Sequence, residues 1–186
     1  MNPLSFRCTG CGNCCRNLRV AVTAADVARL STATGKSPAA LVEWLAPEAV
    51  DMTGEPSSFV EFGQGRRLMV LAQQAGACAL LAADDRCSAY DARPLDCRAF
   101  PFDFDDADAA TGRRRLRLLP HAGCDHAQDG KQDATALAAL DALRWRELGD
   151  YQVRVHSWNR LARQRRRLGH RLGSVEAFLG YALSAR

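Results

Sequence analysis

The chain has 186 residues, of which 47% are apolar and 25% charged, a composition that fits one globular domain with a buried core and excludes a disordered protein. The net charge is +4, but nine arginines against two acids give residues 144–171 a charge of +7 and leave −3 for the rest. The longest apolar stretch, residues 68–83, is too short to span a membrane, and the first residues lack a secretory signal pattern. We therefore expect a cytoplasmic protein without membrane contact, with a single domain over residues 1–186.

The first half of the chain predicts an irregular ligand loop, two short helices and a hairpin. Residues 1–20 are rich in Gly, Asn and Cys, which predicts a loop. Thr23 as a cap and Gly35 as a stop predict a helix between them, and Ser37-Pro38 predicts a second helix that ends before Pro47. Apolar segments at residues 59–62 and 67–71 flank the turn at residues 63–65, which predicts a β-hairpin.

The second half predicts further strands and then a return to helix. Residues 77–81 and 116–119 are strand candidates, which together with the hairpin indicate a small antiparallel sheet. From Ala134 the apolar spacing is helical, with Gly149 as a candidate break, and Ser174 caps a final short helix. The expected fold is therefore α+β and helix-rich, with a cysteine-cluster part over about 6–130 and a basic helical part over about 131–186.

The cysteines provide the strongest chemical signal. They form a tight group and a dispersed group, namely Cys8, Cys11, Cys14 and Cys15, then Cys78, Cys87, Cys97 and Cys124. Cysteines of a cytoplasmic protein stay reduced, which favours metal ligands or redox groups over disulfides. A loop with cysteines at a spacing of three can direct three thiolates at one metal. Adjacent side chains tend to point apart, so we expect Cys15 to point away from Cys14 and to serve a second site.

Eight thiols are enough for two four-coordinate zinc sites, or for an iron–sulfur cluster with a zinc site or spare thiols. Leu18 stands where a bacterial ferredoxin motif would place its fourth cysteine, so that motif is incomplete. The spacing alone does not distinguish zinc from iron.

Two motifs carry a family resemblance: FxCxxCxxCC over residues 6–15 and CSAYDARPLDCRAFP over residues 87–101. Their combination resembles the YkgJ-like CxxCxxCC cysteine-cluster family, a zinc- or iron-chelating domain, over roughly residues 6–124. The resemblance implies that all eight cysteines belong to the metal-binding set. Larger proteins with this cysteine pattern methylate flagellin lysines, which implies by analogy an iron–sulfur-dependent methyl transfer.

Arginines beside the cysteines are candidates for groups that bind the cofactor from outside the ligand shell. Arg98 and Arg93 flank Cys97 and can offset the negative charge of thiolates around a metal, or pair with nearby aspartates. Pro94 and Pro101 predict an extended path for Cys97 between them.

Other candidate sites are weaker. His121 and His126 flank Cys124 and can supply imidazole to a zinc site, or lie in an ordinary loop. The aspartates of residues 103–108 lack the glycine and terminal glutamate of a calcium loop.

The basic stretch from Arg160 to Arg171 suggests a nucleic acid or an acidic protein as partner, with Leu161 and Leu168 left for packing; the alternative is a solvated helix face. Three function classes follow: a metal-binding protein, an iron–sulfur-dependent group-transfer enzyme similar to a methylase, and a zinc-stabilised module that binds nucleic acid or protein.

Overall fold

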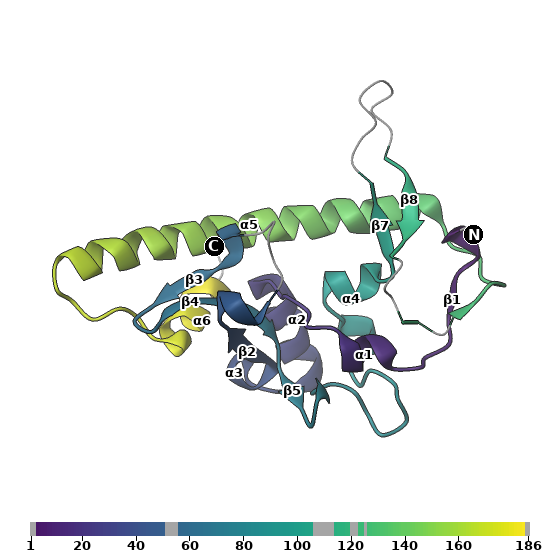
Figure 1. The fold of residues 1–186 in the computed structure, drawn as a ribbon, viewed down its shortest axis with the longest axis horizontal. Helices are drawn as coiled ribbons and strands as arrows, with labels where there is room; N and C mark the ends of the chain where they lie inside the picture. The colour runs from purple at the N-terminus through teal and green to yellow at the C-terminus, as the bar shows by residue number, and fades with distance from the viewer. Residues whose placement is uncertain (1–2, 51–55, 106–113, 120–122, 125, 185–186) are drawn as a thin grey trace.

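The computed structural model describes residues 3–50, 56–105, 114–119, 123–124 and 126–184, and these residues form the expected α+β fold (Figure 1). The α-helices are α1 Asn13–Asn17, α2 Ala24–Thr34, α3 Pro38–Leu41, α4 Leu95–Ala99, α5 Ala134–Arg167 and α6 Val175–Leu183. The strands are β1 Arg7–Cys8, β2 Val42–Leu45, β3 Val60–Phe62, β4 Gly65–Leu71, β5 Gln73–Gln74, β6 Ala77–Cys78, β7 Phe102–Phe104, β8 Leu116–Leu118 and β9 His126–Ala127.

The main sheet is antiparallel, with strand order β2-β4-β3. Its central strand β4 has Leu68 through Leu71 buried in succession, because both faces of the sheet are covered. Met69 and Leu71 belong to the large apolar cluster, whereas Leu68 and Val70 pack with Phe59 in a smaller cluster on the other face. This half of the molecule therefore has its own core.

The other sheets are two-stranded pairs that connect distant parts of the chain: β1 with β9, β5 with β6, and β7 with β8. The predicted hairpin is confirmed as β3 and β4, and the predicted strand at residues 116–119 is confirmed as β8. A third apolar cluster, formed by Phe6, Phe102 and Leu137, joins the β7–β8 pair and the residue before β1 to the start of α5.

The 34-residue helix α5 runs along one side of the whole molecule, with the main sheet and α6 near one end and β1, β7 and β8 near the other (Figure 1). The helix begins at the Asp133 cap, whose carboxylate accepts a hydrogen bond from the amide of Thr135. It continues through Gly149 without a break, so the predicted break there is wrong. The side chain of Asn159 anchors the helix to the sheet: its amide group donates to the carbonyl of Phe59 at 2.8 Å, and its oxygen accepts from the amide of Glu61 at 2.7 Å.

Local signals predicted some boundaries correctly and others not. Helix α2 begins with a full capping box between Thr23 and Asp26 and ends at Gly35 with φ 69°, as expected. The second helix is shorter than predicted: α3 ends at Leu41, and residues 42–45 form strand β2, which pairs with β4. No helix among the described residues has the length and apolarity needed to cross a membrane.

Candidate metal centre

All eight cysteines line one cavity of about 1030 Å³. The first four come from the N-terminal segment through β1 and α1, Cys78 from β6, Cys87 from the loop that follows, and Cys97 from α4; Cys124 lies just before β9. One face of α5, including Glu147, Leu148 and Tyr151, forms a further part of the wall. All eight thiols are free, and all but Cys8 are partly buried.

A close backbone approach holds the N-terminal cysteines beside the loop of Cys87. Gly12 adopts φ 69°, and a Cβ atom there would lie 3.1 Å from the carbonyl oxygen of Asp85. Arg16 also joins the two segments, since it donates to the carbonyl of Cys11 and forms an ion pair with Asp85. Residues 13–17 form helix α1 here, so the expectation of a loop throughout residues 1–20 is wrong at this point.

The larger cysteine group gathers around Cys14. The hydrogen bond from the Cys15 thiol lowers the pKa of Cys14 to about 6, with a smaller contribution from the charge of Arg93. The same bond raises the pKa of Cys15, and the charges of Cys78 and Cys87 raise it further. The two neighbouring thiols therefore meet, and the expectation that Cys15 points away from Cys14 is wrong. Burial raises the pKa of both Cys78 and Cys97. The charges of Cys14 and Cys87 also raise the pKa of each of these two thiols, so the four sulfurs are close enough to interact.

The smaller group consists of Cys8, Cys11 and Cys124. Burial raises the pKa of Cys124 to about 11, and the charges of Cys11 and Cys8 add to this rise, with a smaller contribution from Cys14 of the larger group. Strand pairing places Cys8 opposite His126, so their side chains share one face of the β1–β9 pair. The Nε2 atom of His126 is buried and has no hydrogen-bond partner among the described residues, while Nδ1 lies 2.9 Å from the carbonyl of Cys124. The other predicted histidine, His121, lies outside the described residues.

The sulfur atoms lie around the same cavity but do not form a ready coordination site. Within the described ranges, no three side chains of His, Cys, Asp or Glu are already set to hold a metal ion. The donor set nevertheless fits a soft ion, because eight thiols and an unpartnered imidazole nitrogen are the ligands that zinc and iron–sulfur centres use.

The two candidate arginines both line the cavity. The guanidinium carbon of Arg93 lies 3.7 Å from the ring centroid of Tyr90, and its Nε donates to the carbonyl of the same residue at 3.0 Å. The charge of Arg93 also acts on Cys14. Arg98 lies one residue beyond Cys97 in α4, a helix that replaces the extended path predicted for this cysteine.

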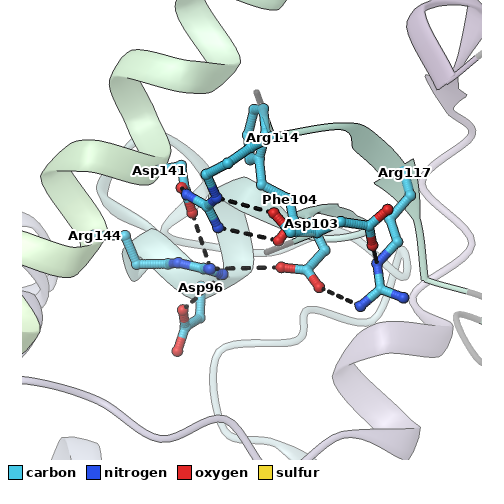
Figure 2. Close-up of polar contacts among 8 residues, drawn as sticks. Asp96, Asp103, Phe104, Arg114, Arg117, Asp141 and Arg144 are labelled. Atoms are coloured by element: carbon cyan, nitrogen blue, oxygen red, sulfur yellow. Dashed lines mark hydrogen bonds and ion pairs between the residues drawn. The ribbon is translucent and has the colours of Figure 1, made fainter. Parts of the chain in front are cut away.

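A network of ion pairs attaches α4 to α5 and β7 (Figure 2). Arg144 of α5 lies at the centre, 3.6 Å from Asp96, 3.7 Å from Asp103 and 3.0 Å from the buried Asp141. Arg114 approaches Asp141 from the other side at 2.5 Å. Asp96 precedes Cys97, so these contacts connect the cysteine to the long helix. Sequence reasoning did not identify this network, because its members are distant in the chain.

The remaining candidates have structural contacts of their own. Asp103 and Asp105 pair with Arg117 on β8, while Asp106 and Asp108 lie outside the described residues. Arg163 and Arg166 on α5 form ion pairs with Glu61 of β3. Leu161 and Leu168 do not pack as expected, since 47% and 62% of their surfaces are exposed, and Ala162 is buried instead.

Comparison with known proteins agrees with the cysteine pattern. No curated protein and no solved structure matches the chain. A family model matches residues 7–116, more than half of the sequence, which includes every cysteine except Cys124. The chain therefore belongs to the CxxCxxCC family, described as a putative zinc- or iron-chelating domain.

Proposed function

We propose that this protein binds zinc or iron through its cysteines in the cavity between the N-terminal segment, α4 and α5. The observation that carries the proposal is that eight cysteines from five separate segments line the same cavity. Burial of so many thiols side by side has no packing advantage over alanine or valine, whereas each is a good ligand once deprotonated. Metal binding would also offset the repulsion between neighbouring thiolates.

The interactions among the thiols support two sites. The first takes Cys78, Cys87 and Cys97 together with Cys14, which makes a complete set of four thiolates. The second takes Cys8, Cys11 and Cys124 with the Nε2 atom of His126, a set of three thiolates and one imidazole. Cys15 donates its hydrogen bond to Cys14 and so acts on the first site from outside.

Arg93 and Arg98 would then stabilise the first site electrostatically. Four thiolates around a divalent ion leave an excess negative charge, and the guanidinium of Arg93 already favours the ionised form of Cys14. Arg98 lies on the same short helix as Cys97. We expect their replacement by glutamine to weaken metal retention without abolishing it.

Anaerobic purification followed by metal analysis and an absorption spectrum of the same sample tests the proposal. Two zinc ions per chain without a visible band, or iron with a charge-transfer band, would support it and identify the metal. The two sites are separated by variants: Cys97→Ser should lose the first metal only, and His126→Gln the second only. His156→Gln, which changes an exposed histidine of α5, is the matched control. The proposal would be refuted if neither zinc nor iron co-purified and all eight thiols reacted freely in the folded protein.

A second candidate, an iron–sulfur-dependent group-transfer enzyme, is favoured by the size of the cavity. Its volume of about 1030 Å³ exceeds what metal ions require and falls in the range of sites for organic molecules. The buried hydroxyl of Tyr151, on this wall, has no hydrogen-bond partner among the described residues. Iron with bound sulfide in the purified protein, and protection of the cavity thiols by a small molecule, would distinguish this function from metal binding alone.

A further inference from the structure

Apolar side chains lie exposed on the side of α5 that faces away from the core. Three of the large apolar residues that the described structure leaves exposed lie on this side, at the end of α5 away from the cavity: Val153, Leu161 and Leu168. Trp145 of α5 is also exposed, but it lines the cysteine cavity. Val153 is 67% exposed and Leu168 is 62% exposed. Helical spacing of about 100° per residue spreads Val153, Leu161 and Leu168 over an arc of about 80°, in which Val153 lies opposite the buried Tyr151 and Leu161 lies to one side.

These three side chains form a seam that another helix can follow. They are separated by eight and seven residues, about two helical turns each, so the line through them turns around the helix by less than a quarter of its circumference. From Val153 to Leu168 the seam extends about 22 Å at about 1.5 Å per residue. Figure 1 shows this half of α5 running along the edge of the molecule.

Arginines flank the seam on both sides. Helical spacing places Arg160 and Arg167 along one edge and Arg165 along the other, and all three are exposed. Arg163 and Arg166 are turned toward Glu61 instead. No acidic residue occurs from Tyr151 to the end of α5 at Arg167, so nothing on the helix itself neutralises these charges.

We propose that the outer face of α5, made of Val153, Leu161, Leu168 and the flanking Arg160, Arg165 and Arg167, docks an acidic amphipathic helix of another protein. An apolar stripe on that helix would cover the seam, and acidic residues beside the stripe would pair with the arginines. This match of charge and shape selects the occupant.

The same features disfavour a nucleic acid and a second copy of this chain as the partner. A nucleic acid backbone would pair with the arginines but would bury little of the valine and leucine surface. A second copy of this chain would bring arginine against arginine along the seam, which costs binding energy. The proposal does not depend on which metal the cavity holds.

Fluorescence anisotropy on the purified, metal-loaded protein provides the test. The probe is a labelled helical peptide of about three heptads, with leucines as an apolar stripe and glutamates beside it. A peptide of the same design with lysines in place of glutamates, and a random-sequence DNA duplex, are the comparison ligands. We expect the acidic peptide to bind, the lysine peptide not to bind, and the duplex to be released by moderate salt.

Two double variants separate the apolar and the charged contribution. Each double variant should weaken binding of the acidic peptide by about tenfold or more: one is Leu161→Gln with Leu168→Gln, the other Arg160→Glu with Arg167→Glu. Arg115→Glu with Lys131→Glu, which changes the net charge equally at exposed positions near the other end of the molecule, should change the affinity less than about twofold. Unaltered circular dichroism and metal content verify that each variant is folded.

Three results would overturn the proposal. The first is equal binding of the acidic peptide to all variants, or no binding at all. The second is duplex binding that persists at moderate salt and is indifferent to the leucine changes. The third is a dimer in sedimentation analysis that the leucine changes dissociate, which would make the outer face of α5 a self-association surface.

Discussion

Gly130 lies where the segment after β9 passes over the backbone of β1. Its amide donates to the carbonyl of Ser5 at 2.8 Å, and a Cβ atom at this position would lie 2.0 Å from the carbonyl oxygen of Phe6 and 2.5 Å from the carbonyl carbon. Van der Waals contact requires about 3.2 Å, so Gly130→Ala forces the two backbones apart by about 1.2 Å. A neighbouring backbone cannot rotate away as a flexible side chain would.

The cost of this displacement is estimated from overpacked cores, which lose about 1–3 kcal/mol. For a chain of this size each kcal/mol corresponds to about 2–4 °C, so the unfolding midpoint of Gly130→Ala should fall by about 2–12 °C. The displaced segments carry Cys8 and His126, so we also expect the variant to lose the second metal and to keep the first. Thermal unfolding and metal analysis of the same preparation measure both effects.

Gly149→Ala is the matched control, because the same substitution should act in the opposite direction. Gly149 lies inside α5, and a Cβ atom there would meet no other atom within 4 Å. Alanine should therefore stabilise the protein by about 0.5–1 kcal/mol through helix propensity, with both metals retained. The close-approach argument fails if Gly130→Ala unfolds at the same temperature as the unchanged protein, or if both substitutions shift the midpoint in the same direction.

Three further predictions concern buried polar groups and the thiols. Tyr151→Phe should be neutral or stabilising by up to about 1 kcal/mol in chemical denaturation, because the hydroxyl that it removes is buried without a partner among the described residues; a clear loss of stability would reveal a bound water or ligand. Asp141→Asn should lower the free energy of unfolding by about 1–3 kcal/mol, since it leaves Arg114 and Arg144 without their buried charged partner. Asp105→Asn, at an exposed ion pair, should change it by no more than about 0.5 kcal/mol. Equal effects of the two substitutions would contradict this. Burial raises the pKa of Cys124 to about 11, so a metal ion that binds this thiol at pH 7 must displace its proton. Zinc affinity in a chelator competition should therefore rise by at least about tenfold per pH unit between pH 6 and 8. A flat pH profile would exclude ligation by the Cys124 thiolate.

Local signals predicted the elements whose ends are determined within a few residues. The capping box at Thr23, the turn glycine at Gly35 and the Ser174 cap all lie where a helix begins or ends, as expected. Residues 42–45 were predicted as helix because the Ser37-Pro38 start signal is followed by no stop signal before Pro47. Pairing with β4, nearly thirty residues away, decides in favour of a strand.

Tertiary packing also explains the other differences. Gly149 costs a helix only about 1 kcal/mol, and the buried contacts of Tyr151 and Val155 that follow it easily exceed that cost. Pro94 suggested an extended path, yet proline also suits the residue at a helix start, and the chain forms α4 directly after it. The single domain over residues 1–186 stays a prediction.

The candidate ligands were more predictable from the sequence than their grouping in the cavity. The CxxCxxCC motif and the downstream cysteines were recognisable from spacing and resemblance alone. Which thiols face one another was not, because Cys78, Cys87 and Cys97 reach the cavity from a strand, a loop and a helix. His126 was recognisable as a nearby donor, but only the β1–β9 pairing sets it opposite Cys8.

The two proposed metal sites differ in how much surrounding structure supports them. Cys78, Cys87 and Cys97 pack against the large apolar cluster, which the main sheet, α2 and α6 stabilise without any metal. Cys124 packs against the small cluster of Phe6, Phe102 and Leu137, and its segment is otherwise held by the short β1–β9 pair. The first site is therefore built into a preformed scaffold, whereas the second would contribute much of the stability of its own surroundings when metal binds. Because α5 contacts both clusters, the state of the second site would be transmitted to the long helix at Leu137 and not at its distant basic half.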